Sequence, residues 1–154
     1  MRYLCLVHYD EELLDALSPS ALATLEHESR AYDDELRARG QLVVAHALQR
    51  VKTAKVVQLR QGRIAQRDGP FTETKEQLGG FLLIDVPDLN AAIQVAARVP
   101  MVRYASIEVR VDELRHVLGR HAAGHLRVAA VDQAQVSHDA ILSTMATRRT
   151  SMLA

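Results

Sequence analysis

Apolar side chains fill both alternating faces of residues 2–9, which predicts a strand in the middle of a sheet. One face would carry Tyr3, Cys5, Val7 and Tyr9, and the other Leu4, Leu6 and His8. A strand that is apolar on both faces is usually central, because neighbouring layers cover it on each side.

Two segments carry the signals of helices. Residues 19–39 have a favourable helix start, with Ser18 as N-cap and proline at the first helical position. Gly40 can end this helix in a left-handed conformation. The side chains spaced three and four apart, which predict one buried stripe, are Leu22, Leu25, Ser29, Tyr32 and Leu36. Residues 89–98 form the second predicted helix. We expect Asp88 as its cap and Ala92, Ile93 and Ala96 facing inward.

The remaining periodic segments predict strands at 42–46, 81–86 and 104–111, and a hairpin. The hairpin joins residues 55–60 and 63–67 through Gln61-Gly62, where glycine suits a positive φ. The order is β-α-β, hairpin, β-α-β, which predicts a ferredoxin-like α+β fold with an inserted β-hairpin and two helices on one sheet face. The other face would stay uncovered, so we expect a homodimer or a higher oligomer that buries it.

Charge and cysteine content limit the function classes. The 154 residues include 19 basic and 19 acidic side chains, so the formal net charge is zero. Direct nucleic-acid binding normally leaves a basic footprint, and this balance predicts none. Cys5 is the only cysteine, so an intrachain disulfide is impossible. The apolar run at the start is too short for a signal peptide or a membrane span, which predicts a cytoplasmic protein without membrane contact.

The chain changes character after residue 111. Residues 1–111 are predicted to form the domain, and residues 112–154 a C-terminal extension that is weakly helical or partly disordered. His121 and His125 have the i, i+4 spacing of a helical metal pair, but no third ligand is in phase with them. We therefore predict no metal and no cofactor.

A dense signature occupies residues 68–81, with the sequence Asp-Gly-Pro-Phe-Thr-Glu-Thr-Lys-Glu-Gln-Leu-Gly-Gly-Phe. This signature resembles the hallmark of the YCII-related family in its DGPF branch, and the predicted strands and helices around it are similar too. The resemblance implies a dimeric α/β-barrel, in which two sheets face each other. One branch of the family carries a histidine on the first helix; the matching position here is Ser29. His27 lies two residues away and faces away from the apolar stripe.

Each residue of the signature also has a local structural reason. Pro70 should hold Gly69 in extended geometry, and Thr74 with Gln77 fits a capping box for one helical turn. Gly79-Gly80 permits a positive φ or a close approach to a neighbouring segment.

The candidate catalytic residues are Asp68, His8 and His46. Asp68 follows a strand beside a rigid turn, where it could exchange protons or merely bond the amides of its own turn. Each histidine ends a predicted strand and could act as a base near neutral pH or fill a structural position. The candidate ligand-binding residues are Gly69, Pro70, Phe71, Lys75, Glu76, Gly80 and Arg103.

Two functions fit these observations. In the first, the protein binds a small anionic or cyclic metabolite, or is a metal-free acid–base enzyme, with Lys75 or Arg103 attracting an anion. In the second, it is a non-enzymatic accessory or regulatory protein. The resemblance implies this alternative, because the DGPF branch is often encoded beside alternative sigma factors.

Overall fold

The computed structural model describes residues 1–112, and within them one compact unit spans Met1–Val111. The strands are β1 (Arg2–Tyr9), β2 (Leu42–Ala47), β3 (Lys55–Arg60), β4 (Arg63–Asp68), β5 (Gln77–Asp85) and β6 (Ala105–Val111). The helices are α1 (Glu11–Asp15), α2 (Pro19–Ala38) and α3 (Leu89–Arg98), with short 3-10 turns η1 (Val51–Thr53) and η2 (Pro100–Arg103). The predicted extension, with His121 and His125, lies outside the described residues from 113 onward.

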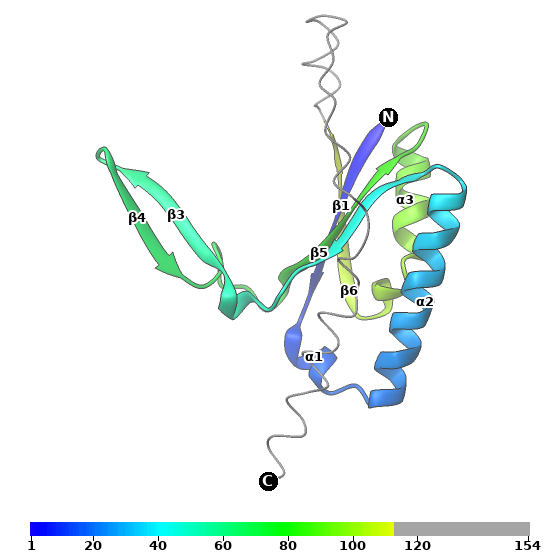
Figure 1. The fold of residues 1–154 in the computed structure, drawn as a ribbon, viewed down its shortest axis with the longest axis horizontal. Helices are drawn as coiled ribbons and strands as arrows, with labels where there is room; N and C mark the ends of the chain where they lie inside the picture. Colours follow the sequence, from blue (N-terminus) through cyan, green and yellow to red (C-terminus); the bar gives the residue numbers. More distant parts are fainter. Residues whose placement is uncertain (113–154) are drawn as a thin grey trace, which may run out of the picture. The chain divides into compact units, whose positions relative to one another are not determined.

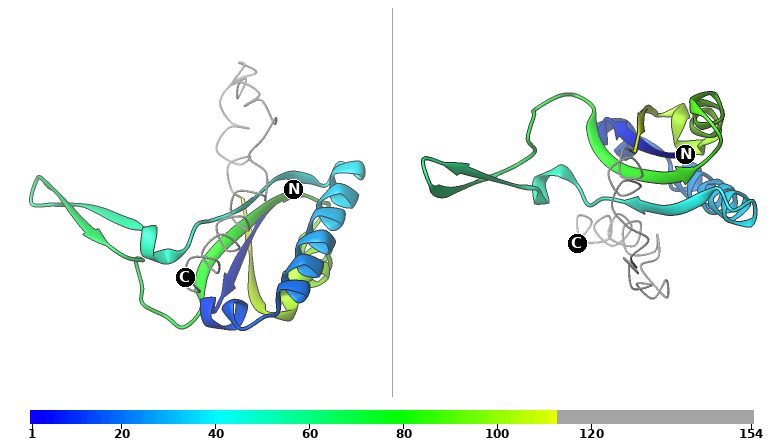
Figure 2. Two further views of the ribbon diagram at one scale, coloured as in Figure 1. Left: turned by 60° about the horizontal axis from the view of Figure 1, so that its bottom comes forward. Right: turned by 90° about the horizontal axis from the view of Figure 1, so that it is seen from above.

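Four strands form one antiparallel sheet in the order β2-β5-β1-β6, so β1 is central as predicted. The helices α2 and α3 lie side by side on one face of this sheet (Figures 1 and 2). The chain is therefore α+β with a ferredoxin-like plan. β3 and β4 form a separate two-stranded sheet, which projects away from the four-stranded one (Figure 1).

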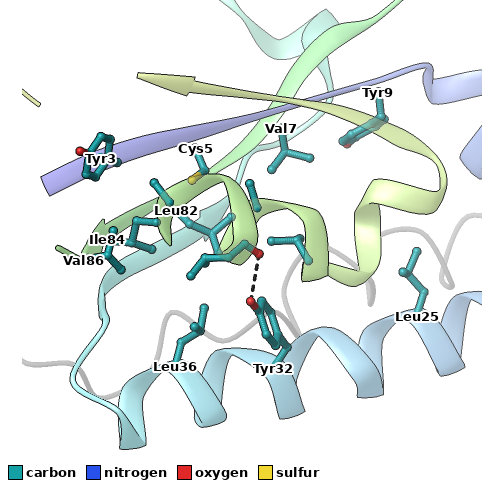
Figure 3. Packing of buried hydrophobic residues seen from close by; sticks show 14 of the residues in the cluster. Tyr3, Cys5, Val7, Tyr9, Leu25, Tyr32, Leu36, Leu82, Ile84 and Val86 are labelled. Atoms are coloured by element: carbon teal, nitrogen blue, oxygen red, sulfur yellow. Dashed lines mark hydrogen bonds between the residues drawn. The ribbon is translucent and has the colours of Figure 1, made fainter. Parts of the chain in front are cut away.

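The hydrophobic core fills the space between the sheet and the two helices (Figure 3). From the sheet it takes alternate residues of β1 and β5, which include the fully buried Cys5 and Ile84. From α2 it takes the predicted stripe, in which Leu25, Tyr32 and Leu36 are buried. The Tyr32 hydroxyl donates a hydrogen bond of 2.9 Å to the Val95 carbonyl, which ties α2 to α3 and satisfies a buried polar group.

The helix α3 has the predicted bounds, and the Asp88 side chain accepts a hydrogen bond from the Ala91 amide. The inward position of Ile93 was a wrong prediction, because its side chain is 46% exposed and Val95 is buried instead. At 3.6 residues per turn, Val95 lies about 60° from Ala92 around the axis and Ile93 about 100°. The small alanines set the inward line, and Val95 lies closer to it.

Two elements differ from the sequence-based expectation. The short helix α1 was not predicted; the Asp10 side chain caps it by accepting from the Glu12 amide at 2.9 Å. The strand β5 begins at Gln77, before the predicted start at residue 81, and passes through Gly79 and Gly80. Glycine weakens a strand, but it is used where another chain segment approaches closely.

Candidate functional site

The sheet face opposite the helices carries His8 near the end of β1. Its neighbours in register are Ser106 on β6 and Leu78 on β5. The His8 Nε2 atom lies 3.6 Å from Glu108 Oε2, while the His8 side chain as a whole is 29% exposed. Nε2 itself is shielded from solvent and makes no hydrogen bond within the described part of the chain. An imidazole nitrogen of this kind has its hydrogen-bonding capacity still unused.

The strand pairing explains how Glu108 comes to lie beside His8. Glu108 pairs directly with Leu6, one step before His8 on the same face. Such diagonal neighbours on antiparallel strands are about 7–8 Å apart at their Cα atoms, within reach of long side chains. Glu108 also lies 3.0 Å from the Arg110 Nε atom through its other carboxylate oxygen. One oxygen of the Glu108 carboxylate therefore contacts Arg110, and the other oxygen faces the His8 imidazole.

Apolar side chains surround this pair. Leu6 pairs with Phe81, and Leu4 pairs with Leu83, so all four share the face of His8. His46 pairs with Phe81 from the other side, and their rings meet edge to face with centroids 5.7 Å apart. We define the open face as this side of the four-stranded sheet. Both predicted histidines lie on it, but Leu6 and Phe81 stand between them in the register.

Asp68 lies elsewhere, at the end of β4 in the separate hairpin. Its side chain is 82% exposed, and its Oδ1 atom forms an ion pair of 2.6 Å with Lys55 Nζ across the hairpin. Cross-strand pairing puts these two residues directly opposite each other. An exposed ion pair of this kind holds a carboxylate only weakly.

Gly69 departs from the predicted extended conformation, because its φ is +93°. Its amide donates a 3.0 Å hydrogen bond to the Ala54 carbonyl, which closes the base of the hairpin and requires this left-handed geometry. The bias that Pro70 imposes on the preceding residue is thus overridden. Phe71 follows and is 71% exposed as a residue, and its carbonyl accepts from Arg67 Nη2 at 2.6 Å.

The rest of the signature is a coil that leads into β5. The predicted helical turn with a capping box was wrong, because the Gln77 amide group donates to the carbonyls of Thr74 and Thr72. Lys75 Nζ lies 3.7 Å from Asp10 Oδ2, whose side chain is 9% exposed. Lys75 therefore meets a carboxylate at the start of α1, and Glu76 is exposed.

Gly79 and Gly80 have no positive φ, which corrects that part of the expectation, but both lie against close neighbours. A Cβ atom at Gly79 would fall 1.8 Å from Cε1 of the buried Tyr9 ring. A Cβ atom at Gly80 would fall 2.9 Å from the His46 carbonyl oxygen. The glycine pair lets the aromatic ring and strand β2 pack directly on the β5 backbone.

Arg103 is on the helix side of the sheet. It belongs to η2, forms an ion pair with Glu28 of α2, and its Nε atom donates to the Pro100 carbonyl at 3.1 Å. The open face and Arg103 are thus on opposite sides of the sheet. The structure brings Arg103 neither to His8 nor to Asp68.

A charged cluster that the sequence did not reveal joins the exit of β2 to α1. Arg50 Nη1 donates to Asp15 Oδ2 at 2.9 Å and lies 3.5 Å from Glu11 Oε2. The hydrogen bond from Arg50 lowers the pKa of Asp15. Glu11 also accepts from the Val51 amide at 3.0 Å. These partners are more than thirty positions apart in the chain, and no local pattern pairs them.

Within residues 1–112, histidine, cysteine, aspartate and glutamate side chains do not gather in groups of three that could hold a metal ion. The same residues include no helix that is long and apolar enough to cross a membrane.

Residues 1–114 match the YCII-related domain. The chain belongs to this family. The DGPF branch stays a prediction from the signature.

This YCII-related chain is similar to a curated protein and to a solved structure. An uncharacterized protein of Rhizobium meliloti (strain 1021) is 32% identical over 96 residues, which cover 62% of this chain and 77% of that protein. Among solved structures, the 5-chloro-2-hydroxyhydroquinone dehydrochlorinase of Burkholderia phenoliruptrix AC1100 is similar at 15% identity with a TM-score of 0.39. The likeness covers 75% of this chain and 98% of the dehydrochlorinase, and it is too loose to carry that protein's chemistry over.

Proposed function

We propose that this YCII-related protein binds a small cyclic compound on the open face and exchanges a proton with it through His8. The observation that supports the proposal most is the His8 Nε2 atom, which among residues 1–112 is shielded from solvent, lacks a hydrogen bond and lies 3.6 Å from the Glu108 carboxylate. A base that is oriented by a second polar group is the common arrangement of acid–base sites, and it is often looser before a ligand binds.

The surroundings of His8 favour a flat, mostly apolar ligand. Leu6 and Phe81 form a continuous apolar row beside the imidazole, because they pair directly across β1 and β5. Ligand sites typically combine such apolar walls with a few polar groups that fix the orientation of the ligand. Here His8 would supply the polar contact, and the exposed His46 at the far end of the row would supply a second one.

Among the candidate residues, His8 thus takes the proton-transfer role ahead of Asp68. Asp68 is almost fully exposed and paired with Lys55, and Arg103 is engaged by Glu28 on the other side of the sheet. Lys75 faces the Asp10 carboxylate, which opposes the binding of an anion at that position. A neutral or weakly acidic ring compound therefore fits the site better than a strong anion.

NMR of the histidine ring protons tests this proposal directly. The protein is titrated with catechol, benzoate and cyclohexanol, and each ring signal is assigned from the matching His→Gln variant. His27 on α2 is the internal control, because it is exposed and lies on the helix side. We expect a planar ring compound to shift the His8 signal, with a smaller shift at His46 and none at His27.

Two variants separate binding from proton transfer. His8→Gln should weaken the binding of the compound that shifts His8 at least tenfold, which corresponds to about 1.4 kcal/mol. Glu108→Gln should leave affinity within about threefold but slow any turnover of that compound, because the imidazole loses its orienting charge. Equal shifts at His8 and His27, or unchanged binding by His8→Gln, would refute the proposal.

A further inference from the structure

The hairpin formed by β3 and β4 exposes a face of aliphatic side chains. Val57, Leu59 and Ile64 are 62%, 74% and 72% exposed. Leu59 pairs directly with Ile64, and Val57 is two residues from Leu59 on the same strand, so all three lie on one face. We call residues 55–68 the arm and these three side chains its apolar face.

Within residues 1–112, the arm has no third strand beside it, which a hairpin normally needs for support. Its two strands pair only with each other among the described residues, and every residue of β4 is exposed. A two-stranded hairpin on its own is marginally stable in water, and three strands or packing against another layer are needed for independent stability. The arm nevertheless has full cross-strand pairing, from the pair of Lys55 with Asp68 at its base to the pair of Arg60 with Arg63 beside the tight turn at Gln61-Gly62. This combination is typical of an element that packs on another surface.

The charge of the arm is opposite to the charge of the rest of the domain. The arm carries the four basic residues Lys55, Arg60, Arg63 and Arg67 and the single acidic residue Asp68. The other residues between 1 and 112 carry ten basic and fifteen acidic side chains. The arm is therefore basic and the rest of the domain is acidic, so the domain of another copy attracts the arm.

We propose that the arm packs on a second copy of this chain, with the two copies exchanging arms around a two-fold axis. A two-fold contact of this kind uses the same two patches twice. At roughly 100 Å² per aliphatic side chain, each apolar face covers roughly 300 Å². Two arms with the two surfaces they cover would bury about 1,200 Å², the lower end of a stable interface.

The proposal is tested by photo-crosslinking of the purified full-length protein. A benzophenone amino acid is placed at position 64 on the apolar face or at position 65 on the opposite face of β4. We expect position 64 to give a covalent species of twice the chain mass at micromolar concentration, at least fivefold more abundant than the species from position 65. Equal yields from the two positions would overturn the proposal.

Light scattering measures whether the arm holds the copies together. The double variant Leu59→Ser/Ile64→Ser should raise the dissociation constant of the dimer at least tenfold, and the control Ala65→Ser should leave it unchanged. A second variant replaces residues 55–68 with Asn-Gly, which the 3.0 Å hydrogen bond between the Gly69 amide and the Ala54 carbonyl allows. It should remain folded by circular dichroism and dissociate in the same way. A monomer at all micromolar concentrations in the unaltered protein, or a dimer that is unchanged in both arm variants, would overturn the proposal.

Discussion

The contact between Gly79 and the Tyr9 ring gives a prediction whose magnitude follows from the structure. In Gly79→Ala the new methyl group would lie 1.8 Å from Cε1 and 2.4 Å from Cζ of Tyr9, far inside the contact distance. The ring is 7% exposed and belongs to the core, so it can yield only by leaving its packed position or by pushing β1 from β5. Forcing an extra methyl group into a packed core costs about 1–3 kcal/mol.

Urea unfolding should show this cost as a loss of about 2 kcal/mol, and thermal unfolding as a fall of about 10 °C in Tm. A double-mutant cycle with Tyr9→Leu identifies the cause, because leucine removes the ring atoms that the methyl group would meet. In the Tyr9→Leu protein, Gly79→Ala should cost less than about 0.5 kcal/mol, which gives a coupling of about 1.5 kcal/mol.

The tyrosine titration supplies an independent readout of the same contact. Burial, and then the charge of Glu11, raises the pKa of Tyr9 above its usual value. If the methyl group displaces the ring toward solvent, the Tyr9 pKa should return toward the ordinary tyrosine value in Gly79→Ala. The reasoning is refuted if Gly79→Ala costs the same with and without the ring, or if it leaves both stability and the Tyr9 titration unchanged.

Four shorter predictions follow from other features. Burial raises the Cys5 pKa to about 11, so the thiol should react with a disulfide reagent at pH 8 only after urea is added, and stability should fall as the pH rises toward 11. Arg50→Met should cost about 0.5 kcal/mol at neutral pH, because the pair with Asp15 is exposed. Because Arg50 lowers the Asp15 pKa, the stability that the Arg50–Asp15 pair contributes is present above the ordinary carboxyl pKa and is lost as the pH falls through the lowered value. The stabilities of Arg50→Met and the unaltered protein should therefore converge in strong acid. Asp68→Asn should change stability by less than about 1 kcal/mol and leave ring-compound binding intact, as calorimetry can check. A chain that ends at residue 115 should still melt cooperatively, because residues 1–112 contain a hydrophobic core of their own.

The fold was predictable where a local pattern carries long-range information. Apolar side chains on both faces of β1 indicated a central strand, and the caps at Ser18 and Asp88 indicated the starts of two helices. The start of β5 was not predictable, because Gly79-Gly80 has the composition of a turn. The Tyr9 ring beside Gly79 and the β2 backbone beside Gly80 make glycine suitable for this strand, and these contacts join residues seventy and thirty-four positions apart.

The candidate site was predictable only in part, for a similar reason. His8 and Glu108 each have the right chemistry, but their proximity depends on the register of β1 against β6, which a single sequence does not state. The alternation of Ser106, Glu108 and Arg110 with Ala105, Ile107 and Val109 along β6 puts Glu108 on the face away from the helices. It did not show which residue of β1 would lie beside it.

The signature of residues 68–81 and the residues of the proposed chemistry lie in different parts of the molecule. Gly69 closes the base of the arm with its left-handed backbone, and Gly79 and Gly80 make room for Tyr9 and β2. These are packing roles, and they account for the glycines without a ligand. The His8 imidazole, whose Nε2 atom has no hydrogen bond within residues 1–112, and the Glu108 carboxylate come from β1 and β6, outside the signature. A signature of this kind identifies the family, whereas under the proposal above the residues on the open face would decide what the protein binds.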